Sequence, residues 1–379
     1  MDSTDVAIVG GGLVGAAIAY GLLLRDRRVI VIDAGDTDFR AATANLGLVW
    51  VNGKGRRFPA YQRWTRRSAI LWRDFQADLQ KISSVTLEYR QQGGLKYCLG
   101  DDELRQQADN VAALRTEAPD LPDDTSIIDR AELERHLPGV RLGQRVVGAA
   151  LCTADGDVNP LRLWRALRIA IMRLGGSIQT NNPVERISSG PDGYAVHARN
   201  GTVHAGKVVL AAGINNRALA EQIGLTIPIR PERGQILVTE RLAPYLGLPG
   251  NGLRQTVNGT IMIGTSKEKV GEDNSATIKQ ARRMAARAVE ILPALAQVRL
   301  ARQWGGLRVL SPDGFPIYVH APEMPGCFVA TCHSGVTLTA AHAVDLASAI
   351  DGKEHAPGQF SNIFNSFSER RFNVPQASA

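Results

Sequence analysis

A glycine-rich turn near the start of the chain constrains the fold more than any other feature. Residues 6–9 form a short apolar run typical of a buried parallel strand, and the sequence GGGLVG at Gly10–Gly15 follows it directly. In a turn of the G-x-G-x-x-G type, Gly10 permits the tight bend, Gly12 lets the backbone approach a pyrophosphate, and Gly15 lets the next helix pack on the strand. The chain is therefore expected to begin with a strand, a phosphate-binding turn and a helix.

The residues around this turn supply the rest of a dinucleotide site. Leu13 and Val14 stand in the first turn of the expected helix, where free N–H groups and the positive end of the helix dipole favour a phosphate. A second apolar run at 29–32 leads into Asp33 and Ala34, and the Asp33 carboxylate can accept hydrogen bonds from a ribose diol. The unit predicts a bound dinucleotide, and it leaves NAD and FAD equally open.

Length and composition narrow the class of protein. A chain of 379 residues, 44% hydrophobic and 21% charged, can fill more than one core, so we expect two domains. The net charge of +7 is mildly basic and does not by itself indicate a nucleic-acid partner. The cysteines form no C-x-x-C pair and no apolar run reaches ~18 residues, so neither a metal site nor a membrane span is expected. With no basic leader before the first strand, we expect a cytoplasmic protein.

Apolar periodicity organises the remainder of the chain. Helical patterns cover 60–79, 161–174, 277–291 and 337–350, and strand patterns are concentrated at 227–264. The alternation of strands and helices at both ends of the chain, with a strand-rich stretch between them, favours an α/β nucleotide domain interrupted by a second, β-rich domain.

Four further motifs are spread along the chain: GDVNP at 156–160, AAG at 211–213, PERGQ at 231–235 and GGLR at 305–308. With the first turn, they make nearly the whole chain resemble the FAD-dependent amine and D-amino acid oxidoreductases, the family of D-amino acid oxidase, glycine oxidase and sarcosine oxidase. Three other stretches, at 45–55, 262–271 and 333–343, resemble a narrower branch of that family. That branch contains the flavoprotein β subunits of bacterial hydrogen cyanide synthase, opine oxidase and D-hydroxyproline dehydrogenase.

This resemblance implies a fold and a division into domains. The fold is α/β, with a discontinuous Rossmann-type FAD-binding domain and an α+β substrate-binding domain built on an antiparallel sheet. The FAD-binding domain is expected at 1–85, 143–217 and 303–379, and the substrate-binding domain at 86–142 and 218–302.

The resemblance also implies a reaction. It is the oxidation of the C–N bond of a D-amino, imino or N-alkyl amino acid, with D-hydroxyproline and opines foremost, by hydride transfer to flavin N5. The branch implies a catalytic subunit whose partner subunits carry iron–sulfur or other electron-transfer groups and can associate it with a membrane. Two alternatives stay open, namely a glycine or D-amino acid oxidase that acts alone on oxygen, and a basic flavin-fold protein that binds RNA.

Carried over residue by residue, the resemblance assigns a candidate site. Arg308 and His333 are the catalytic candidates, with Arg308 expected to bind the substrate carboxylate. An interdomain ion pair is the alternative for Arg308, and a packing role is equally open for His333. The motif GGLR and the residues up to Pro316 contain no cysteine, so FAD is expected to be non-covalent. The FAD-binding set is Gly10, Gly12, Leu13, Val14, Gly15, Asp33, Ala34, Asn45, Leu46, Gly47, Val184, Ala212, Gly213, Gly306, Arg308, Gly335, Val336, Thr337 and Leu338.

A basic stretch from Arg40 to Arg73 contains no acidic residue. It indicates either a solvated helix face or, by resemblance to relatives with a second flavin, an FMN or partner surface at Lys54, Arg56 and Arg57.

Two residues after the strand-rich stretch bear on substrate and acceptor. Lys267 falls near the position from which sarcosine oxidases direct a lysine at oxygen, although a solvated loop lysine accounts for it as well. Thr265 stands where relatives are expected to carry an acid, so it bears on substrate preference.

Overall fold

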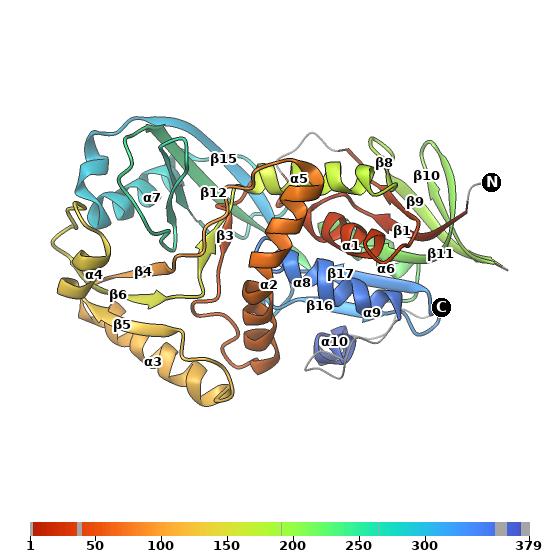
Figure 1. Ribbon diagram of the computed structural model, residues 1–379, viewed down its shortest axis with the longest axis horizontal. Helices are drawn as coiled ribbons and strands as arrows, with labels where there is room; N and C mark the ends of the chain where they lie inside the picture. Colours follow the sequence, from red (N-terminus) through yellow and green to blue (C-terminus); the bar gives the residue numbers. More distant parts are fainter. Residues whose placement is uncertain (1–2, 36–39, 191, 265, 353–361, 373–379) are drawn as a thin grey trace.

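The computed structural model describes residues 3–35, 40–190, 192–264, 266–352 and 362–372 (Figure 1). The molecule is elongated, with a sheet covered by helices at one end and antiparallel sheets at the other. The long helix α2 (Pro59–Ser83) lies between these two ends, and strands β12 (Arg230–Arg241) and β15 (Leu300–Leu310) run from the second end toward the first.

The sheet at the first end is mostly parallel. Its strands follow the order β16-β17-β11-β1-β2-β8, with β9 (Val184–Gly190) and β10 (Gly193–Ala198) continuing from β11 as an antiparallel ribbon. The parallel strands are β1 (Ser3–Val9), β2 (Val29–Ile32), β8 (Ser177–Gln179), β11 (Gly201–Leu210) and β17 (Cys327–Thr331), and β16 (Ile317–His320) closes one edge in the antiparallel sense. In sheets of this kind, ligands bind at the carboxyl ends of the parallel strands.

Helices cover this sheet because their sequences are apolar on the side that meets it. Helix α1 (Leu13–Leu23) is buried along almost its whole length and packs against α5 (Pro160–Arg173) and α9 (Ala347–Asp351). Close approach depends on Gly21, where a Cβ would lie 1.8 Å from the carbonyl oxygen of Ala343. Helix α5 begins at Pro160 and is capped by Asn159, whose side chain accepts from the N–H groups of Leu161 and Arg162.

Antiparallel sheets form the second end. One has the order β13-β14-β12-β15 and includes β13 (Leu253–Gln255) and β14 (Thr260–Gly264). The other has the order β4-β6-β5, formed by β4 (Gly94–Leu99), β6 (Val146–Cys152) and β5 (Thr125–Asp129). Helices α3 (Asp101–Glu117), α4 (Arg130–His136) and α7 (Ile278–Ile291) pack on these sheets, and one apolar cluster joins both sheets to α7.

The remaining strands and helices are short. Strands β3 (Leu48–Val49) and β7 (Gly156–Asp157) pair with each other, and α6 (Asn216–Glu221), α8 (Thr339–Ala341) and α10 (Ile363–Ser366) complete the helices described. The helix expected at 337–350 is instead three segments, because a π-helical turn at His342–Leu346 lies between α8 and α9. The predicted α/β class, with a Rossmann-like sheet and additional antiparallel sheets, is confirmed. No helix in the described ranges is long and apolar enough to cross a membrane.

Candidate active site

The glycine turn after β1 has the geometry that a phosphate requires. Gly10 has φ +107°, and a Cβ there would lie 2.5 Å from the carbonyl oxygen of Ala211 on the neighbouring strand. At Gly15 a Cβ would lie 2.0 Å from the carbonyl oxygen of Gly10, so both positions require glycine. Gly12 differs, because the only atom near a Cβ there would be the Ala42 Cβ at 3.9 Å. The turn is therefore closed against the sheet at Gly10 and Gly15 and open at Gly12.

Free backbone donors line the open side of the turn. The N–H groups of Gly12, Leu13 and Val14 donate to no acceptor within the described chain, as expected at the beginning of α1. The Trp164 indole donates to the carbonyl oxygen of Gly11 at 2.8 Å and fixes the turn from behind. Free N–H groups, a helix N-terminus and open space fit the pyrophosphate of FAD.

Asp33 lies beside this turn in a charged network. Its Oδ2 accepts from the Gly11 N–H at 2.5 Å, and Arg40 donates to both carboxylate oxygens at 2.9 and 2.8 Å. Burial opposes ionisation, but these hydrogen bonds and the one from Gly35 prevail and lower the pKa of Asp33, so the group is an anion at neutral pH. Ala34 follows it, and the Asn182 N–H donates to the Asp33 carbonyl at 2.9 Å. This hydrogen bond holds the segment just before β9 next to Asp33. Val184, the first residue of β9, therefore lies near the position at which we expect the adenosine.

The loop at 45–47 links the dinucleotide turn to the antiparallel sheet. Asn45 stabilises the loop by accepting from the Gly47 N–H at 2.8 Å and donating to the carbonyl oxygens of Ala41 and Ala42. Gly47 has φ +74° and no room for a Cβ, which would lie 2.1 Å from the Val158 carbonyl oxygen. Leu46 packs with Ile236 and Met262 of the antiparallel sheet. The loop thus occupies the junction at which we expect the flavin ring.

The turn before α8 contributes a second set of free donors. The N–H groups of Gly335, Val336 and Thr337 donate to nothing in the part of the chain described, while the Thr337 carbonyl accepts from Ser68 at 2.6 Å and Trp72 at 2.9 Å. A Cβ at Gly335 would lie 3.8 Å from Val14 Cγ2, so this turn faces the beginning of α1. Leu338 is fully buried behind it. Three adjacent free N–H groups fit an anionic edge such as flavin N1–O2.

The remaining cofactor candidates lie close to these turns. Ala212 follows β11, and its N–H donates to Asn216 Oδ1 at 2.7 Å. Gly213 has φ +62° and open space at its Cβ position, where the nearest atom is Val309 Cγ2 at 3.7 Å. Gly306 lies in β15 opposite Gly234 of β12.

Arg308 is held at one of its guanidinium nitrogens. Its Nη1 donates to the Ser266 carbonyl at 2.8 Å and lies 3.4 Å from Glu232 Oε1, whereas Nε and Nη2 have no partner among the residues described. Its guanidinium lies flat against Gly234, where a Cβ would be 2.3 Å from Nη2 and 2.4 Å from Cζ. The arginine is therefore fixed at one nitrogen and presents the others as an open fork. Its ion pair with Glu232 joins β15 to β12 of the same sheet, and these residues fall on opposite sides of the expected domain boundary, so Arg308 has both the ion pair of the alternative interpretation and the free nitrogens of a carboxylate anchor.

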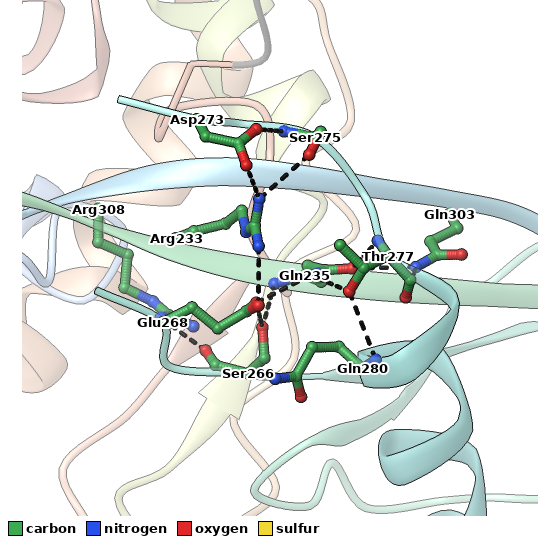
Figure 2. Close-up of polar contacts among 10 residues, drawn as sticks. All are labelled: Arg233, Gln235, Ser266, Glu268, Asp273, Ser275, Thr277, Gln280, Gln303 and Arg308. Atoms are coloured by element: carbon green, nitrogen blue, oxygen red, sulfur yellow. Dashed lines mark hydrogen bonds and ion pairs between the residues drawn. The ribbon is translucent and has the colours of Figure 1, made fainter. Parts of the chain in front are cut away.

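A buried polar network behind Arg308 fixes its partner Ser266 (Figure 2). Arg233 binds Glu268 at 2.9 Å and Asp273 at 2.5 Å with its side chain only 4% exposed. Ser266 Oγ accepts from the Gln235 N–H at 2.9 Å and donates to Glu268 at 2.7 Å. In the sequence, the motif PERGQ supports only the resemblance to the family. No feature of the sequence indicates that Glu268 is the partner of Arg233.

His333 stands among cations. The protein around it, and then the charges of Lys54, Arg308 and Lys267, lower the pKa of His333 to about 3. The imidazole is therefore neutral at physiological pH. His333 is an exposed residue, which differs from the buried, hydrogen-bonded His342, whose Nε2 contacts the Tyr318 hydroxyl at 2.7 Å.

The basic stretch separates into outer and inner residues. Arg56 pairs with Glu117 at 3.0 Å, and the Arg57 backbone N–H donates to the same carboxylate at 2.7 Å. Lys54 instead extends inward and donates to Ser334 Oγ at 3.0 Å, beside His333. Lys267 is exposed and directly follows Ser266, and Thr265 lies outside the described residues. No group of three or more metal-ligating side chains occurs in the described ranges.

Comparisons with known proteins bear on the family and the fold. The family model described as FAD dependent oxidoreductase (DAO) matches residues 5–349. The chain is 38% identical to a subunit of the opine oxidase of Agrobacterium tumefaciens (strain Ach5), covering 100% of both chains. It is 29% identical to hydrogen cyanide synthase subunit HcnC of Pseudomonas aeruginosa, covering 87% of each. The crystal structure of glycine oxidase from Geobacillus kaustophilus superposes with a TM-score of 0.87 at 24% identity, over 97% of this chain and 99% of that one.

Proposed function

Because this chain belongs to the FAD dependent oxidoreductase family, we propose that it oxidises the C–N bond of an amino acid whose carboxylate binds Arg308. The observation that carries the proposal is the open guanidinium fork, fixed at Nη1 by the Ser266 carbonyl and Glu232 and free at Nε and Nη2 within the described chain. The expected substrates are N-alkyl or imino acids such as opines and D-hydroxyproline. Support for an opine comes from the 38% identity to the opine oxidase of Agrobacterium tumefaciens.

The roles of the residues follow from this assignment. FAD supplies the hydride acceptor, held by the free N–H groups at 12–14, by Asp33 and by those at 335–337. Arg308 binds the carboxylate in a bidentate manner and so orients the carbon next to nitrogen. The cations around His333 also favour the neutral form of the substrate amine, since a positive field lowers the pKa of an ammonium group. A side-chain base is therefore not required, and a neutral His333 can line the site without taking the proton.

Partner subunits are part of the proposal. The opine oxidase relative and HcnC are both named as subunits, which favours a catalytic subunit that passes electrons to an electron-transferring partner. An oxidase acting alone on oxygen is the second candidate, and the glycine oxidase likeness at 24% identity supports it only at the level of fold. An additional FMN is not part of this proposal, since Arg56 and the Arg57 N–H bind Glu117 and Lys54 donates to Ser334.

We propose that different parts of the chain bind FAD and the substrate. Residues 1–85, 143–217 and 303–379 would bind FAD, and 86–142 and 218–302 would shape the substrate site. Strand β15 runs across the boundary between 302 and 303, and β6, although it lies within 143–217, pairs with β4 and β5 of the substrate-binding part.

Anaerobic flavin reduction tests the proposed function. The FAD-loaded protein is mixed without oxygen with octopine, nopaline, cis-4-hydroxy-D-proline, D-proline, sarcosine and glycine, and the flavin absorbance is followed. We expect the opines or the D-imino acids to bleach the flavin, and an absence of bleaching by every compound would refute amine oxidation. Admitting oxygen then separates the two candidates, since an electron-transferring subunit reduces a dye without stoichiometric hydrogen peroxide.

A further inference from the structure

Cations near the active site fall into two groups that differ in their counter-ions. On the outer side of the basic stretch, each of four arginines has a carboxylate within 3.0 Å: Arg56 with Glu117, Arg63 with Asp120, Arg66 with Asp124 and Arg67 with Asp345. On the inner side, Lys54, Lys96 and Lys267 have no carboxylate within the 4.0 Å of an ion pair anywhere in the described ranges. The outer cations are in direct ion pairs, and the inner ones are in none within those ranges.

The inner lysines come from three separate elements and gather near Arg308. Lys54 lies on the loop before α2 and donates to Ser334 Oγ at 3.0 Å; that hydroxyl also accepts from Tyr61 Oη at 2.7 Å. Lys96, on β4, places its Nζ 3.8 Å from the position of a Cβ on Gly53, the residue before Lys54. Lys267 follows Ser266, whose carbonyl accepts from Arg308.

The charges of these side chains change one another's pKa, as expected for groups that lie close together. Burial lowers the pKa of Lys54 to about 8, and the charges of Lys267 and Arg308 act in the same direction. Burial also lowers the pKa of Lys96, again with a contribution from Lys267. The Asp155 carboxyl acts on Lys54 in the opposite direction, and because burial raises the pKa of Asp155 to about 7, this carboxyl is only partly ionised at neutral pH.

We propose that Lys54, with Lys96 and Lys267, forms a second anion subsite beside Arg308 and selects substrates in which a secondary amine joins two carboxylate-bearing groups. This inference rests on the proposed function, since Arg308 is taken to hold the first carboxylate. A monocarboxylate such as D-hydroxyproline would leave the lysines without a counter-ion, whereas a dianion matches the concentrated positive charge. The lysines therefore favour an opine-type dicarboxylate over a cyclic imino acid.

Matched ligands isolate the second carboxylate. Thiodiglycolate and (methylthio)acetate carry a thioether in place of the amine, so neither can be oxidised by removal of hydride next to nitrogen, and they differ by one carboxylate. Their dissociation constants are measured on the FAD-loaded protein by calorimetry or by the flavin spectrum. The oxidisable counterparts, iminodiacetate and sarcosine, are compared by anaerobic reduction. The readout is the ratio of affinity for the dicarboxylate to affinity for the monocarboxylate.

Substitution of Lys54 should change that ratio. Lys54→Met is expected to lower the preference for thiodiglycolate by about 10- to 100-fold, the value of one charge-assisted hydrogen bond. Lys267→Met should lower it in the same direction, and because Lys267 is exposed, this variant carries the test if Lys54→Met does not retain FAD. The exposed Lys81 at the end of α2 provides the control, since Lys81→Met should leave the ratio unchanged.

The outcomes separate this inference from the proposed function. An unchanged ratio in both Lys54→Met and Lys267→Met, or a wild-type protein without preference for the dicarboxylate, would overturn the second subsite. Failure of every amine to reduce the flavin would overturn the proposed function, while the thioether pair would still decide whether a dianion binds at the lysines.

Discussion

Replacing Gly234 by alanine tests whether the guanidinium of Arg308 holds the substrate carboxylate. Gly234 lies in the middle of β12, opposite Gly306 of β15, and is not among the glycines with positive φ, so the strand itself accepts alanine. A Cβ at this position would lie 2.3, 2.4 and 2.7 Å from Nη2, Cζ and Nη1 of Arg308. The group that must move is therefore the end of the arginine side chain and not the backbone.

The size of the effect follows from these distances. Ordinary contact between non-bonded heavy atoms is about 3.5–4.0 Å, so the guanidinium has to retreat by roughly 1 Å. A displacement of that size costs about 100-fold in rate when the displaced group positions a substrate. That factor corresponds to roughly 2.7 kcal/mol of transition-state stabilisation. We expect the free energy of unfolding to fall by only about 1 kcal/mol, because the contact at risk is the Arg308–Ser266 hydrogen bond.

Two measurements on one variant check this prediction. Anaerobic flavin reduction with the best amino acid gives kcat/KM, and thermal unfolding gives Tm. Gly234→Ala should lower kcat/KM by about 100-fold, mainly through KM, with a small change in Tm. Gly247→Ala is the control, because no atom lies within 4 Å of a Cβ there. Unchanged kcat/KM in Gly234→Ala would refute the assignment of Arg308 as the anchor.

Other changes should separate binding from folding. Arg308→Lys keeps the charge but loses the bidentate fork, so KM for every amino acid substrate should rise by about 10- to 100-fold, and an unaltered KM would contradict the assignment. Gly12→Ala should fold normally yet purify with less FAD, because the nearest atom to its Cβ position is 3.9 Å away. Gly15→Ala should instead lower Tm, because its Cβ position is 2.0 Å from a carbonyl oxygen; equal behaviour of these two variants would refute the description of the turn. The preference for a dicarboxylate should fall as pH rises through about 8, where Lys54 loses its proton, and should depend less on pH there in Lys54→Met.

Local patterns in the sequence were sufficient to predict the parallel sheet and the turn after β1. The apolar run at 6–9, the glycine spacing and Asp33 are consecutive features whose meaning depends on short-range geometry. Helices α2 and α7 lie close to the expected ranges because their apolar periodicity is long and regular. The π-helical turn at His342–Leu346 could not be expected, since its sequence is largely apolar and carries no period that distinguishes it from an α-helix.

The polar contacts of the site were less predictable. Arg233 and Glu268 are 35 residues apart, and their pairing depends on how the loop after β14 lies on β12. Lys54 was grouped by sequence with Arg56 and Arg57, but the loop directs it toward Ser334 while its neighbours meet Glu117. The order of charged residues in the sequence does not indicate which residues of a basic stretch face outward, because their direction depends on which other segments contact the stretch.

The most direct test of amine oxidation with the substrate held by Arg308 uses a substrate labelled with deuterium at the carbon next to nitrogen. The FAD-loaded protein is mixed without oxygen with iminodiacetate and its deuterated form, and flavin absorbance is followed in a stopped-flow instrument. We expect complete bleaching in the wild-type protein, slower with the deuterated substrate, and loss of bleaching at the same concentration in Arg308→Gln. Bleaching that is equally fast in Arg308→Gln, or no bleaching with iminodiacetate, an opine or a D-imino acid, would contradict this expectation.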